Sequence, residues 1–407
     1  MPMCRRHRAG VAWCLLVGLI AARVAAAQDT STVVHIGLTY NPAAPPTISV
    51  VPVVGPNGDS IQAVIERDLV NSDRFTVVPL EEPDTKAYRD STAAGGLNYP
   101  LFKALRVREA VQVIPTAGGL HVVLYDVDSA RVAVAKDFAI PAPALGREWR
   151  FALHGISDAI EQWITGERGI AATRIAYIRG GSPRVVDSDG AEDITVPTDS
   201  GPYCPAWSPD GATVAYNTIG RGRIMTVALA TGRGQTIVPY LLNHELGGPH
   251  FTPSGDSIAF VRDDGSASEL WIVSRTGTGA RRIASLPAVN SNLSFSPDGR
   301  RLAFMTGRAL HPQIYTMDAD GANARMLTSI LRVTDSTYNS DPAWSPNGLT
   351  IAFQSQVNGH FQLETITMRD TRVAQLTSDG ENRHPSWAPD SRHLVFQSDR
   401  SGAQQLW

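Results

Sequence analysis

A turn motif that recurs five times constrains this chain more than any other feature of its 407 residues. Each copy places an aromatic residue before a Ser-Pro-Asp-Gly sequence or a close variant of it. The copies start 44, 44, 49 and 43 residues apart, at Trp207, Phe251, Phe295, Trp344 and Trp387. Proline presets φ for a turn and glycine supplies positive φ, so each copy indicates a strand end followed by a tight turn. A period in the forties built from strands and turns is typical of β-propeller blades.

A short apolar strand follows every turn, as in Val214–Tyr216. A sixth copy of this second strand, Ile175–Tyr177, has no turn motif before it. We therefore expect a six-bladed propeller over residues 172–407, with six second strands but only five first strands. Trp407 corresponds to Trp271, which lies 24 residues before the next motif. The last blade is thus predicted to be incomplete in this chain, because the alternative, an open ring, would leave two strand edges exposed.

The first 27 residues are predicted to be a secretory signal peptide. Arginines at positions 5, 6 and 8 form a positive start, residues 9–22 are apolar, and Ala25–Ala27 offers a small-residue cleavage site. We expect cleavage after Ala27. No other stretch is long and apolar enough to cross a bilayer, so we expect a periplasmic protein that reaches membranes only through its partners.

Residues 28–168 are predicted to form a small α/β domain, which makes the whole chain an α+β multidomain protein. Two amphipathic helices are expected, Ser60–Asn71 after the N-cap Asp59 and Glu148–Thr165 before Gly166. Their buried faces are predicted to carry Ile61, Val64, Ile65 and Leu69 in the first helix, and Leu153, Ile156, Ile160 and either Trp163 or Ile164 in the second. The expected strands are Ser31–Leu38, Ile48–Val54, Phe75–Pro79, Ala110–Pro115, Leu120–Asp126 and Arg131–Ile140, with a short helix over Tyr99–Leu105.

The sequence shows little sign of catalytic chemistry. It contains no Gly-x-Ser-x-Gly elbow, and His244-Glu245 lacks the second histidine of a zinc-binding helix. Asp187–Gly190 and Asp318–Gly321 lack the downstream glutamate of a calcium loop and fit blade turns instead. Binding to nucleic acid needs a basic surface, and the net charge of −3 gives no sign of one. We therefore expect no catalytic residue, metal ligand, cofactor or nucleic-acid partner.

Polar residues recur where each first strand begins, and in a propeller these positions ring one mouth. Asn and His side chains both donate and accept hydrogen bonds, which suits a wet protein interface, and Tyr and Arg are frequent anchors of such interfaces. The predicted partner-binding residues are Tyr203, His244, His250, Asn290, Asn292, Asn339, Asp341, Asn382, Arg383 and His384. The alternative is that Asn and Pro occur here only because they suit turns.

Beyond these patterns, the chain resembles the TolB family, the periplasmic propeller proteins of the Tol-Pal system. The resemblance is carried by Ile48–Pro52, by Asp68–Ser72 with the following Arg74-Phe75, and by Trp163–Gly166 followed by Thr173–Ile178. With the blade motifs, it covers essentially the whole chain after the signal peptide. The order of signal peptide, small α/β domain and six-bladed propeller is also that of the family.

The resemblance implies a non-enzymatic scaffold that supports outer-membrane integrity and constriction during cell division. It implies that the mouth binds Pal, the peptidoglycan-associated lipoprotein. It also implies that the segment Gln28–Tyr40 is offered to TolA, by adding a strand to an exposed sheet edge.

The candidate TolA-binding residues are Val33, Val34, His35 and Ile36, for which a structural strand in the α/β domain is the competing role. We expect a monomer. The alternative function is a secreted propeller hydrolase or a carbohydrate-binding module, for which the mouth offers only the carboxylates of Glu245, Asp341 and Glu381.

Overall fold

The computed structural model describes residues 45–81, 84–86, 96–198, 201–218, 222–286, 289–309, 311–328 and 338–407. The signal peptide and the predicted strand Ser31–Leu38 lie outside the described residues. The described residues up to Thr173 form one compact unit, the N-terminal unit, and those from Arg174 onward form another, the propeller unit. Within these described parts, no helix is both long enough and apolar enough to span a bilayer.

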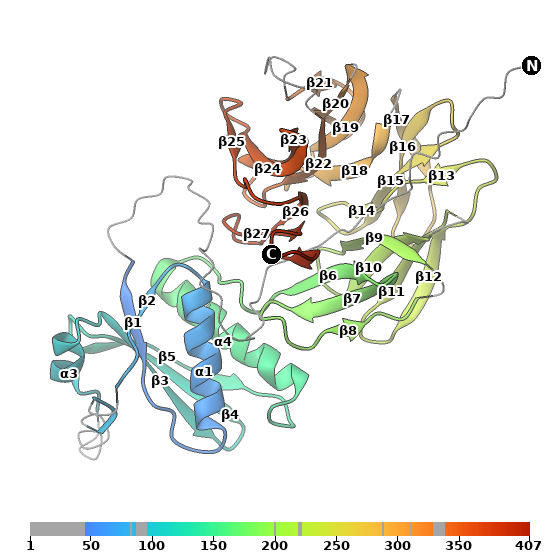
Figure 1. Cartoon of the computed structure of the whole chain (residues 1–407). Coiled ribbons are helices and arrows are strands. Elements are labelled where there is room, and N and C mark those ends of the chain that lie inside the picture. Colours follow the sequence, from blue (N-terminus) through green and yellow to red (C-terminus); the bar gives the residue numbers. More distant parts are fainter. Residues whose placement is uncertain are drawn as a thin grey trace, which may run out of the picture. The chain divides into compact units, whose positions relative to one another are not determined.

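The N-terminal unit contains a five-stranded mixed sheet (Figure 1). In spatial order its strands are β2 (Thr76–Val77), β1 (Thr47–Val50), β3 (Glu109–Thr116), β4 (Gly119–Asp126) and β5 (Arg131–Ala139). β1 runs parallel to both of its neighbours, whereas β3, β4 and β5 form an antiparallel meander. The first strand ends at Val50 rather than at the predicted Val54, because the chain leaves the sheet to enter the turn before the first helix.

Two long helices cover one face of this sheet. They are α1 (Gly58–Asn71) and α4 (Arg147–Thr165), and the apolar faces predicted for both are buried or half-buried. Ile65 and Leu153, which are fully buried, belong to the core that the helices share with the sheet. A short helix, α3 (Tyr99–Ala104), packs Phe102 into a second core. The period of the apolar residues therefore predicted both helical faces correctly.

The start of α1 differs from the prediction. The helix begins at Gly58, and the residue at the N-cap position is Asn57, in a left-handed conformation with φ of 58°. Asp59 was expected to be the cap, but it lies in the first turn, where its charge favours the helix dipole. A Cβ on Gly58 would lie only 2.0 Å from the carbonyl oxygen of Val53. The tight turn before α1 therefore sets where the helix begins.

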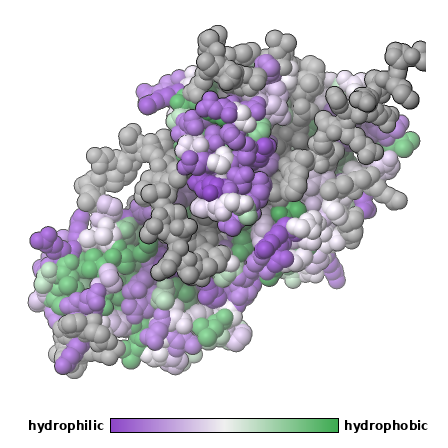
Figure 2. All heavy atoms as spheres, viewed as in Figure 1, coloured by the Kyte–Doolittle hydropathy of each residue, from purple (hydrophilic) through white to green (hydrophobic). Residues whose placement is uncertain are grey.

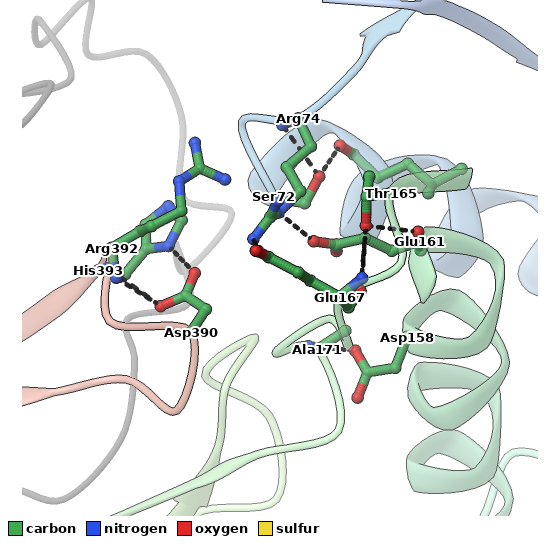
Figure 3. A network of polar contacts seen from close by, with 11 residues as sticks. Ser72, Arg74, Asp158, Glu161, Thr165, Glu167, Ala171, Asp390, Arg392 and His393 are labelled. Carbon is green, nitrogen blue, oxygen red and sulfur yellow. Dashed lines mark hydrogen bonds and ion pairs between the residues drawn. The ribbon is translucent and has the colours of Figure 1, made fainter. Parts of the chain in front are cut away.

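A polar network holds the segment that follows α4 (Figure 3). A carboxylate of α4, that of Asp158, accepts the backbone N–H groups of Ala171 and Ala172 at 2.7 and 3.2 Å. Burial raises the pKa of Asp158 to about 6, although both hydrogen bonds oppose the shift. A Cβ on Gly169 would lie 2.6 Å from an Asp158 carboxylate oxygen. Residues 169–172 are thus fixed onto α4.

The propeller unit contains six sheets that follow one another around a ring, from green to red in Figure 1. The predicted six-bladed propeller is therefore confirmed. Among the described residues, the first and last sheets have three strands each. The strands are β6 (Arg174–Arg179), β7 (Ser182–Asp187), β8 (Ile194–Thr195), β9 (Pro202–Trp207), β10 (Thr213–Thr218), β11 (Ile224–Ala228), β12 (Arg233–Val238), β13 (Glu245–Leu246), β14 (His250–Phe251), β15 (Ser257–Asp263), β16 (Ser268–Ser274), β17 (Arg281–Leu286), β18 (Val289–Phe295), β19 (Arg301–Ala309), β20 (His311–Asp318), β21 (Arg325–Met326), β22 (Asn339–Trp344), β23 (Thr350–Val357), β24 (His360–Thr367), β25 (Val373–Gln375), β26 (Asn382–Trp387), β27 (Leu394–Ser398) and β28 (Gln405–Leu406).

The first strands of the blades lie nearest the propeller axis. They are β9, β13 with β14, β18, β22 and β26, and they contact one another from blade to blade: β14 contacts β9, and β22 contacts both β18 and β26. The first and last sheets also touch through side chains. Ile175 and Val186 of the first sheet form a buried cluster with Val395 of the last.

The recurrent turns form as predicted. Serine hydroxyls at positions 208, 296 and 345 accept the N–H groups of Thr213, Arg301 and Thr350 at 2.9, 2.9 and 3.0 Å. The turn glycines have φ between 67° and 77°, a range that glycine adopts without strain; they are Gly211, Gly255, Gly299 and Gly348. A Cβ on any of the last three would lie 3.3–3.7 Å from the proline of the preceding turn. Successive turns therefore touch around the end of the propeller where the first strands finish.

The last turn departs from the motif and is held differently. Ser391 replaces the glycine at φ of 58°, and its hydroxyl accepts the Asn347 N–H of the preceding turn at 2.9 Å. Ala388 lacks the serine hydroxyl. In its place Asp390, whose side chain is buried, bonds to His393 Nδ1 at 2.6 Å (Figure 3). The Asp–His pair thus stabilises this turn.

Exposed apolar residues are unevenly distributed. Figure 2 shows hydrophobic residues gathered on the N-terminal unit, at lower left, whereas the propeller surface in view is mainly hydrophilic. Among the described propeller residues, the exposed large hydrophobic ones are Tyr240, Leu242, Met326 and Leu349.

Candidate functional site

Most residues predicted to ring the mouth lie inside the first strands rather than in the loops before them; His244 is the exception among those described. We call the end of the propeller at which the first strands begin the mouth. Asn290 and Asn292 belong to β18, but their side chains lie outside the described part of the structure. The candidate TolA-binding residues Val33, Val34, His35 and Ile36 also lie outside it.

Three of the first strands share a β-bulge near the mouth. In β22, Ser340 pairs with Gln354 and Ala343 pairs with Ala352. Between these two pairs, β22 therefore has one residue more than β23. The same extra residue occurs in β9 and β26. The bulged residues are Cys204, Asp341 and His384, with φ of 51°, 52° and 55°, and each precedes a proline. A bulge bends its strand and re-aims a side chain, so one side chain per blade is redirected here.

The bulged residues of neighbouring blades meet. His384 Nδ1 lies 2.7 Å from Asp341 Oδ2, and both side chains are about nine-tenths buried. A Cβ on Gly248 would lie 2.9 Å from the Cβ of Cys204, so glycine makes room for this side chain at the corresponding position of the next blade. Two redirected side chains of neighbouring blades therefore meet as the Asp341–His384 ion pair, whereas Cys204 faces a glycine.

His250 of β14 is held in its neutral form. Its Nε2 accepts the backbone N–H of Leu293 in the next blade at 3.4 Å. Burial lowers the pKa of His250 to about 4, although the carboxylate of Asp341 opposes the shift. Asp341, which belongs to the blade after next, is therefore near enough to act on the pKa of His250.

We expect His250 to make the propeller less stable as the pH falls from 6.5 to 4. The imidazole has a pKa of 6.5 in the unfolded chain and about 4 in the folded one. The unfolded state therefore binds the proton first, and about 2 kcal/mol of stability is lost by pH 5 but retained above pH 6.5. His250→Gln, which keeps an acceptor for the Leu293 N–H, is expected to escape this loss. Urea denaturation at both pH values measures it, and equal losses in the two proteins would contradict the prediction.

Asn339 and Asn382 hold their blades together. The Asn339 amide donates to Gln313 Oε1 at 2.9 Å, and Asn382 donates to Gln362 Oε1 at the same distance. Both asparagines are buried, at 4% and 0% exposure. Thr328 and Thr377 complete the two networks by donating to the same glutamine oxygens at 2.8 Å. These amides are therefore used within the fold, as links between blades inside strands rather than as the turn residues of the alternative.

Tyr203 and His244 are used partly within the fold. The half-buried Tyr203 donates its hydroxyl to the carbonyl oxygen of Leu246 at 3.2 Å. Burial, with the nearby carboxylate of Glu245, raises the pKa of Tyr203 to about 12, so its hydroxyl stays protonated. His244 Nδ1 lies 2.8 Å from the carbonyl oxygen of Leu242 and ties down the loop before β13.

Arg383 is the predicted residue best placed to meet a partner. Its side chain is 36% exposed, and the guanidinium lies 4.0 Å from the centre of the Phe361 ring and 3.1 Å from Glu381. Tyr338 packs edge-on against Phe361, with ring centres 5.6 Å apart. Neither aromatic residue belongs to the predicted set, although Tyr338 directly precedes the predicted Asn339. Arg and Tyr in a pre-packed cluster are typical of interface anchors.

A Ser–His–Asp cluster in the N-terminal unit does not have the geometry of a catalytic triad. One oxygen of Asp68 accepts both the Ser157 hydroxyl at 2.8 Å and His154 Nδ1 at 2.7 Å, and all three side chains are buried. A catalytic serine bonds to the imidazole instead. The cluster therefore joins α1 to α4. Among the described residues, no group of three or more His, Cys, Asp or Glu side chains is placed to hold a metal ion.

The repeated blades have a direct match among known families. Residues 161–407 match the family described as the TolB beta propeller domain. This chain belongs to the TolB β-propeller family. A curated TolB relative, the "Tol-Pal system protein TolB" of Bordetella parapertussis, is 28% identical over an alignment of 414 positions that covers 89% of this chain and 90% of the relative. The protein of the same name from Bordetella bronchiseptica matches at the same identity and coverage.

A solved TolB structure shows that the likeness extends to the fold of both units. The crystal structure of TolB from Acinetobacter baumannii matches with a TM-score of 0.75 at 24% identity, covering 97% of this chain and 93% of that one. The resemblance drawn from the sequence is therefore confirmed.

Proposed function

We propose that this protein is a periplasmic, non-enzymatic scaffold of the Tol-Pal system whose propeller mouth binds a Pal-like lipoprotein. Membership of the TolB family supports the system. The observation that carries the site is the Arg383–Phe361–Tyr338 cluster, which lies next to the Asp341–His384 pair. The guanidinium of Arg383 already rests on the ring of Phe361 before a partner arrives. Little side-chain entropy is therefore lost on binding.

Arg383→Ala is expected to weaken binding of the soluble domain of the cognate Pal-like lipoprotein by about 5- to 150-fold, or about 1–3 kcal/mol. The arginine is partly exposed, so the melting temperature is expected to change little. Titration calorimetry with the full chain measures the effect.

Arg301→Ala is the matched control for this experiment. Arg301 lies 4.9 Å from the centre of the Trp344 ring, at the opposite end of the first strands, and so has the same chemistry away from the mouth. It is expected to bind like the wild type. A wild-type chain that does not bind the domain would refute the proposed partner, whereas an Arg301→Ala chain that binds as weakly as Arg383→Ala would move the site elsewhere.

The second proposed contact is that of the N-terminal segment with a TolA-like protein. The support is the family resemblance together with the β-branched sequence of Val33–Ile36. Such a segment can add a strand to a sheet edge of its partner through main-chain hydrogen bonds. Deleting residues 28–40 is expected to abolish capture of the TolA-like protein while Pal binding persists; capture by the shortened chain would refute this role.

The mouth carboxylates support binding rather than hydrolysis. Asp341 is paired with His384, and Glu381 lies 2.8 Å from His360 and 3.1 Å from Arg383. Glycoside hydrolysis instead needs two carboxyl groups that face each other across the scissile bond. The proposed scaffold, a monomer that reaches membranes only through its partners, would support outer-membrane integrity and constriction during division. Turnover of glycoside or peptide substrates by the purified chain would favour the alternative, a secreted enzyme.

A further inference from the structure

An apolar loop leads into the mouth between β12 and β13. Two of its side chains are turned out, with Tyr240 at 48% and Leu242 at 72% exposure. Between them Leu241 packs against the core cluster of this blade, which includes Phe251 and Phe260. Leaving large apolar side chains in water forfeits the free energy that their burial would release. The exposure of two large apolar side chains on either side of a half-buried one indicates a use outside the fold.

Local hydrogen bonds hold this loop in shape. The His244 N–H donates to the carbonyl oxygen of Leu241 at 3.3 Å, and His244 Nδ1 contacts that of Leu242 at 2.8 Å. Asn243 between them has φ of 61°, a conformation that asparagine adopts more readily than most residues. The two exposed side chains are therefore presented on a backbone that is already ordered, which lowers the entropy lost when a partner binds.

The surroundings of the loop are acidic. Glu245, the residue after His244, is exposed and lies directly opposite Asp263 on β15. The Asp263 carboxylate accepts the Gly265 N–H at 2.7 Å and so serves the turn after β15, whereas Glu245 adds a second negative charge beside it. Asp264 follows, and hydrogen bonds from Ser266 lower its pKa to about 2. The guanidinium of the nearby Arg262 lies 4.6 Å from the centre of the Trp271 ring. It forms an ion pair with the carboxylate of Glu269 at 3.5 Å, so its charge is partly neutralised.

We propose that Tyr240 and Leu242 form the apolar anchor by which the mouth holds its partner, and that the partner presents an apolar pocket bordered by Lys or Arg side chains. The proposal rests on the function proposed above and assigns this pocket to the soluble domain of the Pal-like lipoprotein. The acidic surroundings complement such a border, and the loop is continuous with the first strand β13, so one partner can cover the loop and the mouth together.

Leu242→Asp is expected to weaken binding of that domain at least 10-fold, because it places a charge where an apolar contact forms. Tyr240→Ala is expected to weaken it by a smaller factor, and Glu245→Lys to weaken it most at low salt. Leu349→Asp is the matched control: Leu349 is 65% exposed but follows the turn at the opposite end of the first strands. It is expected to bind like the wild type.

The outcomes separate this inference from the proposed function. Wild-type affinity in Leu242→Asp, with weakened binding in Arg383→Ala, would overturn the anchor but leave the mouth as the Pal site. No binding by the wild type would overturn both. A dimer that Leu242→Asp converts to monomer in sedimentation would assign the loop to a second copy of this chain and also overturn the proposal.

Discussion

Replacing Arg74 with methionine is expected to destabilise the N-terminal unit by about 3–5 kcal/mol, the cost of removing one partner of a buried ion pair. Arg74 Nε lies 2.6 Å from Glu161 on α4, and a terminal nitrogen lies 2.5 Å from Glu167 just beyond that helix (Figure 3). The Glu161 side chain is only 6% exposed. Without the guanidinium its carboxylate stays buried beside methionine, or the end of α4 opens to admit water.

A double-mutant cycle tests this explanation. Arg74→Met with Glu161→Gln is expected to recover much of the lost stability, because the neutral amide needs no counter-charge. The free energy of unfolding is measured by denaturation in urea. Arg168→Met is the control: Arg168 is 73% exposed and lies 3.9 Å from the buried Asp158, and exposed pairs contribute at most about 1 kcal/mol. Losses that add in the double mutant would show that Arg74 and Glu161 do not interact energetically.

Gly58→Ala is expected to cost about 3 kcal/mol or more. The added methyl group would overlap the Val53 carbonyl oxygen at 2.0 Å, a backbone atom that cannot move without opening the turn before α1. Overpacking against backbone outweighs the roughly 1 kcal/mol by which alanine is normally favoured over glycine in a helix.

Gly155→Ala provides a control within the same unit. Gly155 lies in the interior of α4, and an added Cβ there would meet no atom within 4 Å. This substitution is expected to stabilise the protein by about 0.5–1 kcal/mol. Thermal melts of the two variants should therefore shift in opposite directions. Equal shifts would mean that helix propensity, rather than contact with Val53, decides the effect at Gly58.

Local patterns in the sequence were sufficient for the architecture. Three local features depend only on residues close together in the chain: the Pro-Asp-Gly turns, the short apolar strands and the 3.6-residue period of both helices. Each could therefore be predicted from a short stretch of sequence. The family followed from the same motifs. The start of α1 could not be read in this way, because the contact between Gly58 and Val53 is a matter of packing rather than capping preference.

The accessible residues of the mouth depended on the tertiary structure. Asn339 and Arg383 both belong to the predicted ring, yet Asn339 is buried against Gln313, 26 residues earlier in the chain, whereas Arg383 remains partly exposed on Phe361. The bulge that turns Asp341 toward His384 likewise needs two neighbouring blades. The sequence by itself therefore determined the propeller, the helical faces and the family. Which polar side chains serve the fold and which can meet a partner was decided only by packing between distant segments, because exposure depends on neighbours that the ring brings together.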